Sequence, residues 1–215
     1  MLRETVLAAC LIIGGADMAW SACPGQTGKP IYSDDFTDDS GGWDIDAAES
    51  FVPAALQIKV NSKSKVAGAL NLTFFAVNGD YCAVMAFPAQ PRDADIQDYV
   101  SLVVLAADYK NSYSLELNTS GEAVIGHTDN GSFTVLARTN ISAIKTTPGS
   151  ENTLRIVVKD QKLTFSVNDT PIKTLRGQTP EGGKKFGFLA GVTGDNPPAS
   201  ERVYTVKSFS VTEAP

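Results

Sequence analysis

Glu116 is the acid best placed to do chemistry, because it lies inside a run that alternates as a β-strand does. In residues 112–118 (SYSLELN) every second side chain is apolar, and Glu116 falls on the polar face with Ser114 and Asn118. Arg155 lies on the polar face of another predicted strand and is a candidate partner. A surface ion pair is the simplest interpretation of two such residues.

His127 is the sole histidine and the one side chain whose ordinary pKa lies near neutrality. It precedes the turn sequence 128–131 (TDNG), and no cysteine or carboxylate stands at metal-ligand spacing from it. We expect an exposed histidine at a strand end. The sequence contains no Gly-x-Ser-x-Gly elbow, and a triad would have to use this one histidine, so no catalytic residue is predicted.

A ligand site is the better candidate, since sugars are bound by aromatic platforms together with planar polar groups. Tyr99 and Tyr109 lie near predicted strand ends, and the polar loop of Arg92 and Asp95 precedes Tyr99. Trp43 and Tyr113 are instead expected in the core. The candidate ligand-binding residues are Tyr99, Tyr109, Arg92, Asp95, Glu116 and Arg155.

Calcium is the cofactor to weigh, because it takes six to eight oxygen ligands from carboxylates and carbonyls. Asp34 and Asp35 begin an acidic cluster near the first predicted strand, and they are the candidate ligands. The EF-hand spacing is absent, so solvated loop acids are the alternative interpretation. No other cofactor is expected.

Two of the three cysteines follow the N-terminal apolar stretch, and we expect Cys23 and Cys82 to form a disulfide. A pair without CxxC spacing in a chain with one histidine fits a disulfide better than a metal site. The bond would close a loop of about 60 residues, which the chain-entropy model values at about 4 kcal/mol. In the alternative, Cys23 is acylated and Cys82 is a free buried thiol.

Residues 1–22 have the parts of a secretory signal: Arg3, an apolar stretch over 6–13, and small residues before Cys23. Cleavage is expected after Ser21 or Ala22, which predicts a secreted or periplasmic protein, or an outer-membrane lipoprotein if Cys23 is acylated. No later segment has the about 20 apolar residues of a membrane span. Removing 1–22 changes the formal net charge from −6 to −5. Since no basic face is evident, nucleic acid is excluded as a partner.

The remaining residues 23–215 predict one all-β domain. Apolar side chains alternate in 154–158 and in 163–167, which are joined by the turn KDQK and therefore predict a hairpin. Residues 100–107 are apolar on both faces, as a central covered strand would be. The alternation in 203–211 slips near Lys207 and Ser208, where a bulge is expected. About a dozen strands are predicted, more than the about seven of an immunoglobulin sandwich, which favours a large jelly roll.

Several of these strand motifs carry a family resemblance. They are Ser33-Asp34-Asp35-Phe36 with Gly42-Trp43, residues 152–158 (NTLRIVV) with 163–169 (LTFSVND), 185–191 (KFGFLAG) and 206–211 (VKSFSV). In this order they resemble the concanavalin A-like lectin/glucanase superfamily, and within it the 3-keto-disaccharide hydrolase domain. The resemblance implies a jelly-roll sandwich and a carbohydrate ligand. Glucanases of the superfamily carry a Glu-x-Asp-x-x-Glu strand motif, which is absent here.

Three functions follow as hypotheses. The first is an exported, non-catalytic module that binds a glycan or another cell-envelope ligand on one face of the sandwich. The second is a glycoside-processing hydrolase of the 3-keto-disaccharide hydrolase type that acts through loop carboxylates. The third is a structural or protein-interaction domain of the envelope, which would bind no sugar.

Overall fold

The computed structural model describes residues 23–91, 96–194 and 197–215, and the predicted signal segment lies outside them. These residues form fourteen strands joined by turns and loops. The strands are β1 Pro30–Asp34, β2 Glu49–Val52, β3 Ala55–Val60, β4 Val66–Leu70, β5 Gly79–Ala86, β6 Gln97–Asp108, β7 Asn111–Asn118, β8 Glu122–Asp129, β9 Ser132–Asn140, β10 Glu151–Lys159, β11 Lys162–Val167, β12 Thr170–Arg176, β13 Lys185–Thr193 and β14 Arg202–Thr212. In the described part of the chain, no helix is long and apolar enough to cross a membrane.

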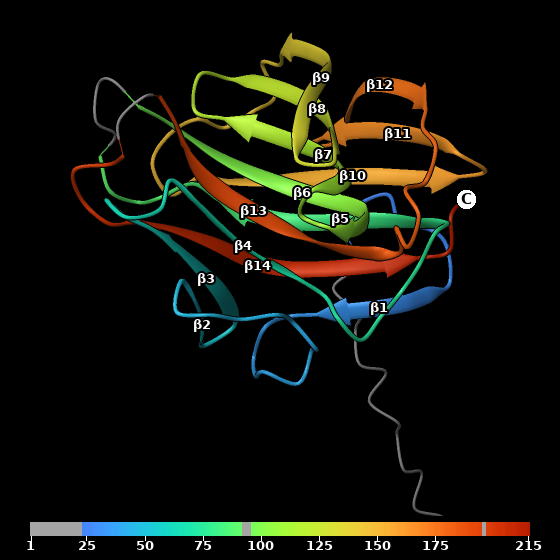
Figure 1. Ribbon diagram of the computed structural model, residues 1–215, viewed down its shortest axis with the longest axis horizontal. Coiled ribbons are helices and arrows are strands. Elements are labelled where there is room, and N and C mark those ends of the chain that lie inside the picture. Colours follow the sequence, from blue (N-terminus) through green and yellow to red (C-terminus); the bar gives the residue numbers. More distant parts are fainter. Residues whose placement is uncertain (1–22, 92–95, 195–196) are drawn as a thin grey trace, which may run out of the picture.

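The strands make two antiparallel sheets packed face to face. The eight-stranded sheet has the order β12-β11-β10-β5-β14-β3-β2, with β1 also paired to β14, and the six-stranded sheet has the order β4-β13-β6-β7-β8-β9. In Figure 1, β13 and β6 cross in front of β14 and β5, so the two sheets are seen as two layers. The predicted all-β sandwich is confirmed.

The predicted hairpin is also confirmed. Its strands β10 and β11 pair with Ile156 opposite Phe165, and their apolar side chains are buried together between the sheets. The turn residues Asp160 and Gln161 both have positive φ, as a type I′ turn requires. This turn follows the right-handed twist of the strands, and the alternation therefore points its apolar set into the core.

The two other strand predictions hold as well. The twelve-residue strand β6 lies between β13 and β7, and its residues from Val100 to Ala106 are buried on both faces. In β14 the register with β5 shifts between Val206 and Ser208, where the bulge is predicted.

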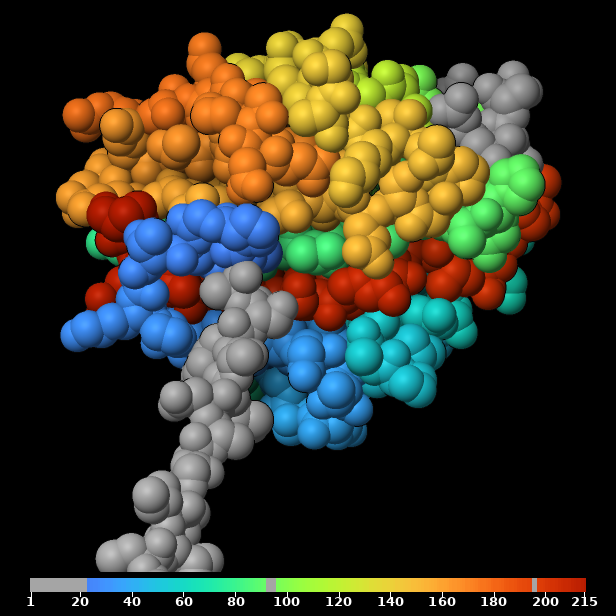
Figure 2. Space-filling view, turned by 180° about the vertical axis from the view of Figure 1, so that it is seen from behind, coloured from blue at the N-terminus to red at the C-terminus, as the bar shows by residue number. Residues whose placement is uncertain are grey.

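The N-terminal arm, residues 23–28, is held on the outside of the eight-stranded sheet. Figure 2 shows this face, with the blue arm lying over green β5 and red β14. Cys23 is joined to Cys82 of β5 by the predicted disulfide, and Gln26 accepts a hydrogen bond from Ser210 and donates one to the Asp80 carbonyl. Since the Cys23 sulfur is in this bond, it cannot also carry a thioether-linked lipid. The alternative of acylated Cys23 with free Cys82 is not compatible with the structure.

One buried ion pair joins the two sheets near the end of the sandwich. Arg202 of β14 and Asp98 of β6 have side chains only 1% exposed and are linked by two hydrogen bonds, Nε to Oδ1 at 2.9 Å and Nη2 to Oδ2 at 2.5 Å. The Tyr204 hydroxyl also donates to Asp98. Both charges are therefore neutralised inside the protein, as buried charges must be.

Candidate functional site

The outer face of the six-stranded sheet gathers polar side chains that the register places side by side. Ser101 of β6 lies opposite Glu116 of β7, and Glu116 lies opposite Val124 of β8. Tyr99 lies opposite Asn118 one step along the same face. We call this surface the polar face, defined by Tyr99, Ser101, Ser114, Glu116, Asn118, Glu122 and Arg138. Alternation alone places these residues away from the core.

Glu116 is half-buried on this face, and its carboxyl group is unusual. Burial raises the pKa of Glu116 to about 7, with a contribution from the negative charge of Glu122, while Arg138 acts in the opposite direction. Burial and then the charge of Glu116 raise the pKa of the Tyr99 phenol. Glu116 is therefore partly protonated near neutral pH and can donate a hydrogen bond as well as accept one.

Glu122 is the second carboxylate of the polar face, and it is engaged differently. It forms an ion pair of 2.8 Å with Arg138 of β9 and accepts a hydrogen bond from the Asn118 amide. Glu122 precedes Val124 by two residues, so it is the diagonal neighbour of Glu116, a relation that separates residues by about 7–8 Å and their Cβ atoms by somewhat less. The face thus holds one ion-paired carboxylate and one with a raised pKa.

The buried side-chain hydroxyl of Ser101 has no hydrogen-bond partner in the described part of the protein. Its side chain is 1% exposed, and among the described residues its Oγ is the buried side-chain polar atom that has no hydrogen-bond partner. A buried hydroxyl without a partner costs free energy, so such a group in a native protein needs an explanation.

Three aromatic residues border the polar face. The Tyr99 ring lies above Gly191 of β13, the Tyr109 hydroxyl donates to the Gly68 carbonyl of β4 at 2.7 Å, and the Phe133 ring lies above Gly126 of β8. Tyr109 is 38% exposed and Phe133 is 50% exposed. Tyr109 lies in the β6–β7 turn and reaches β4 with its hydroxyl, whereas Phe133 lies in β9 at the opposite edge of the sheet.

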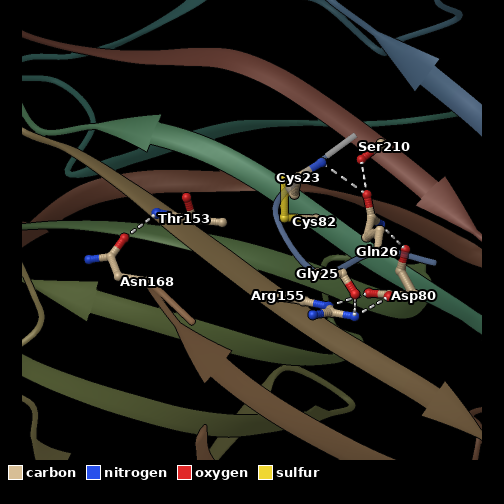
Figure 3. Close-up of a disulfide and its surroundings, with 9 residues drawn as sticks. All are labelled: Cys23, Gly25, Gln26, Asp80, Cys82, Thr153, Arg155, Asn168 and Ser210. Carbon is tan, nitrogen blue, oxygen red and sulfur yellow. Dashed lines mark hydrogen bonds and ion pairs between the residues drawn. A yellow bond between two sulfur atoms is a disulfide. The ribbon is translucent and has the colours of Figure 1, made fainter. Parts of the chain in front are cut away.

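The expected partnership between Glu116 and Arg155 is wrong. Arg155 of β10 lies on the outer face of the other sheet, where its guanidinium donates to both carboxylate oxygens of Asp80 and to the Gly25 carbonyl. Figure 3 shows this cluster beside the disulfide. The side-chain hydrogen bond with Asp80 raises the pKa of Arg155. Arg155 therefore ties the arm to the sheet and does not reach the polar face.

The candidate calcium ligands have other roles. The Asp34 carboxylate accepts hydrogen bonds from the Trp43 indole at 2.7 Å, the Tyr32 hydroxyl at 3.0 Å and the Phe36 amide at 2.7 Å. Asp35 accepts from the amide and hydroxyl of Thr37. The described residues contain no group of three or more His, Cys, Asp or Glu side chains arranged to hold a metal ion. Asp34 thus organises the aromatic core around Trp43.

The other predicted residues divide into three cases. Arg92 and Asp95 lie outside the described residues. Trp43 and Tyr113 are buried in the core, as expected. His127 is not the exposed strand-end residue that we predicted, because its ring is half-buried and stacks on Tyr113 with centroids 4.4 Å apart.

The structure brings Tyr99 and Glu116 together and adds residues that sequence reasoning missed. Ser101, Glu122 and Arg138 join them through the strand register, which a single sequence does not reveal. The sequence carried one signal that could have indicated the place of Phe133: it follows the turn residues Asn130 and Gly131, at the start of a strand. Its position above a glycine of the neighbouring strand carries no sequence signal.

Comparison with solved structures supports the same fold. The chain is similar to the catalytic domain of an endo-1,3-beta-glucanase (laminarinase) from Thermotoga petrophila, with 9% identity, a TM-score of 0.60, and coverage of 87% of this chain and 98% of that one. It is similar to a Bacillus licheniformis beta-glucanase, with 12% identity, a TM-score of 0.62, and coverage of 87% and 100%. It is also similar to the carbohydrate binding module CBM66 from Bacillus subtilis, with 11% identity, a TM-score of 0.60, and coverage of 80% and 96%.

These likenesses define the class of fold. The protein is a concanavalin A-like jelly-roll sandwich, as its strand motifs predict. No protein-family model matches the sequence, and no curated protein matches it either. The narrower resemblance to the 3-keto-disaccharide hydrolase domain therefore stays a prediction.

Proposed function

We propose that the protein is an exported module that binds carbohydrate on the polar face of its six-stranded sheet, without a catalytic role. The observation that carries this proposal is the combination on one face of Tyr99 in β6, exposed Phe133 in the edge strand β9, and half-buried Glu116 in β7 between them. Aromatic rings offer platforms to the C–H faces of sugar rings, and planar polar groups orient their hydroxyls. The fold is shared with a carbohydrate-binding module and with glucanases, which supports the same ligand class.

Export is supported by the N-terminal segment and by the disulfide. A disulfide that pins an arm to a sheet persists in oxidising compartments such as the periplasm or the cell exterior. We infer a secreted or periplasmic protein whose polar face meets glycans or other ligands of the cell envelope.

A glycan array and a cell-wall pull-down test binding. We expect retention of at least one glycan class, and about a tenfold loss of affinity in Glu116→Ala because a hydrogen-bonded ligand group loses its partner. Thr164→Ala, on the outer face of the other sheet, is the matched control and should bind as the wild type does. Blank results at high protein concentration in both assays would reject glycan binding and favour an envelope interaction domain with a copurifying protein partner.

A glycoside hydrolase is the second candidate, and the Glu116–Glu122 diagonal favours it. Inverting enzymes separate a general acid of raised pKa from a carboxylate base by about 6.5–9.5 Å, and the residues of a diagonal pair lie about 7–8 Å apart. Incubation with β-glucans and 3-keto-glycosides, followed by product analysis, separates the two functions. Turnover that is abolished in both Glu116→Gln and Glu122→Gln would replace the binding proposal with catalysis.

A further inference from the structure

Any residue larger than glycine at position 126 of β8 would clash with the aromatic ring of Phe133. A Cβ atom at position 126 would lie 2.2 Å from Cε2 and 2.4 Å from Cζ of Phe133, distances that real Cβ atoms do not adopt. The ring therefore rests directly on the backbone of the neighbouring strand. Phe133 can occupy this position only while residue 126 has no side chain.

The backbone at Gly126 has a register shift with β9 beside it but no conformation that demands a glycine. Gly126 is not among the glycines with positive φ, so an alanine could adopt its conformation. A glycine inside a strand weakens it, and often marks a close approach of another group. The group that approaches here is the Phe133 ring, which gains a fixed orientation against the sheet.

This fixed ring still has a free side. Phe133 is 50% exposed although part of its ring lies against Gly126. The Ser114 hydroxyl lies 2.9 Å from the same Cβ position, and Glu116 is the next residue along that face of β7. An exposed ring is thus bordered by hydroxyl and carboxyl groups on the side toward the centre of the sheet.

We propose that Phe133 is the stacking platform of the site, that Gly126 is the positioning residue that holds its ring flat, and that the ligand is a neutral sugar ring. This inference rests on the proposed glycan-binding function. A sugar stacked on Phe133 points its hydroxyls toward Ser114 and Glu116, which can donate and accept hydrogen bonds. An acidic or sulfated sugar would face Glu116 and Glu122, while Arg138 is already paired with Glu122.

The test is affinity for the glycan identified on an array that contains neutral, uronic acid and sulfated sugars. We expect neutral glycans to bind, Phe133→Ala and Gly126→Ala each to lose about tenfold in affinity, and Phe133→Trp to retain binding within about threefold. Phe75→Ala removes a phenyl ring that is 55% exposed in the β4–β5 loop, and it is the matched control. Melting temperature and circular dichroism report on folding of each variant.

A double-mutant cycle separates positioning from general destabilisation. If Gly126 acts through the ring, Gly126→Ala will cause no further loss of affinity in a protein that already carries Phe133→Ala. An additional loss in the double variant would overturn the positioning role. Unchanged binding in Phe133→Ala would overturn the platform while leaving glycan binding intact, and a preference for anionic glycans would overturn the neutral ligand. An array without any bound glycan would overturn the proposed function together with this inference.

Discussion

Glu116 shows how a strand position can change the chemistry of an ordinary carboxyl group. Its neighbours on the polar face are Ser101, Ser114 and Val124, which are all buried and exclude water from one side of it. Desolvation penalises the charged form, so near neutral pH the folded protein partly retains a proton that the unfolded chain has released.

This difference predicts how stability depends on pH. Because the pKa of Glu116 is about 7 in the folded protein and 4.5 as its ordinary value, the folded state binds more protons between these values, and stability falls as pH rises through this range. Glu116→Gln removes the effect. We expect the variant to be more stable than the wild type by on the order of 2 kcal/mol at pH 8–9, less than the full shift implies because Glu116 is partly exposed.

Urea denaturation at pH 4 and at pH 8.5 measures the difference in free energy of unfolding between Glu116→Gln and the wild type at each pH. The control is wild-type protein at both pH values. Burial also raises the pKa of Glu49 to about 7, but Glu49 is present in wild type and variant alike and cancels in the difference. Equal stability differences at the two pH values would show that Glu116 titrates normally in the folded protein.

At the scale of elements, the arm and β5 are joined by a covalent bond and by polar contacts. The bond between Cys23 and Cys82 spans 59 residues of sequence, and Arg155 bridges the Gly25 carbonyl and Asp80 beside it. We predict that Cys23→Ser lowers the free energy of unfolding by about 4 kcal/mol, since the unfolded chain is no longer constrained. Denaturation of wild type and variant, each with and without reductant, measures this. The variant should be insensitive to reductant, and a wild type that is also insensitive would contradict the bond.

The contact between β6 and β14 depends on a charge pair rather than on apolar packing alone. Arg202→Met removes one charge and leaves Asp98 buried with the Tyr204 hydroxyl as a remaining donor. Breaking such a pair costs about 3–5 kcal/mol, and we expect a loss of this size in thermal or urea denaturation. Arg138→Met, which breaks an exposed ion pair, is the control and should cost less than about 1 kcal/mol. Similar losses in the two variants would argue against a special role for the buried pair.

At the scale of the whole molecule, one end of the core is built from aromatic rings that pack around Trp43. Asp34, one of the two candidate calcium ligands, accepts hydrogen bonds from Trp43 and Tyr32. We therefore expect the melting temperature to be the same with EDTA and with added calcium. A rise of several degrees with calcium would place an ion in this region or elsewhere in the protein.

The sequence by itself predicted the all-β class, the hairpin of β10 and β11, and the disulfide between Cys23 and Cys82. Alternation of apolar residues is a local property, so Leu154 to Val158 and residues 163–167 were identifiable without knowing their neighbours. The turn at Asp160 and Gln161 and the bulge near Ser208 are local for the same reason. Alternation also placed Glu116 with Ser114 and Asn118 on a polar face, and Tyr99 was a candidate because it is an aromatic residue near a predicted strand end.

Only the tertiary structure decided which sheet each strand joins and which side chains meet. Alternation shows that Glu116 and Arg155 face away from the core, but a sandwich has two outer faces, and these residues occupy opposite ones. The contact of Phe133 with Gly126 depends on the register between β8 and β9, and that register includes a shift beside Gly126. Register is set by long-range packing rather than by the residues of one strand, so the polar face became visible only in the folded protein.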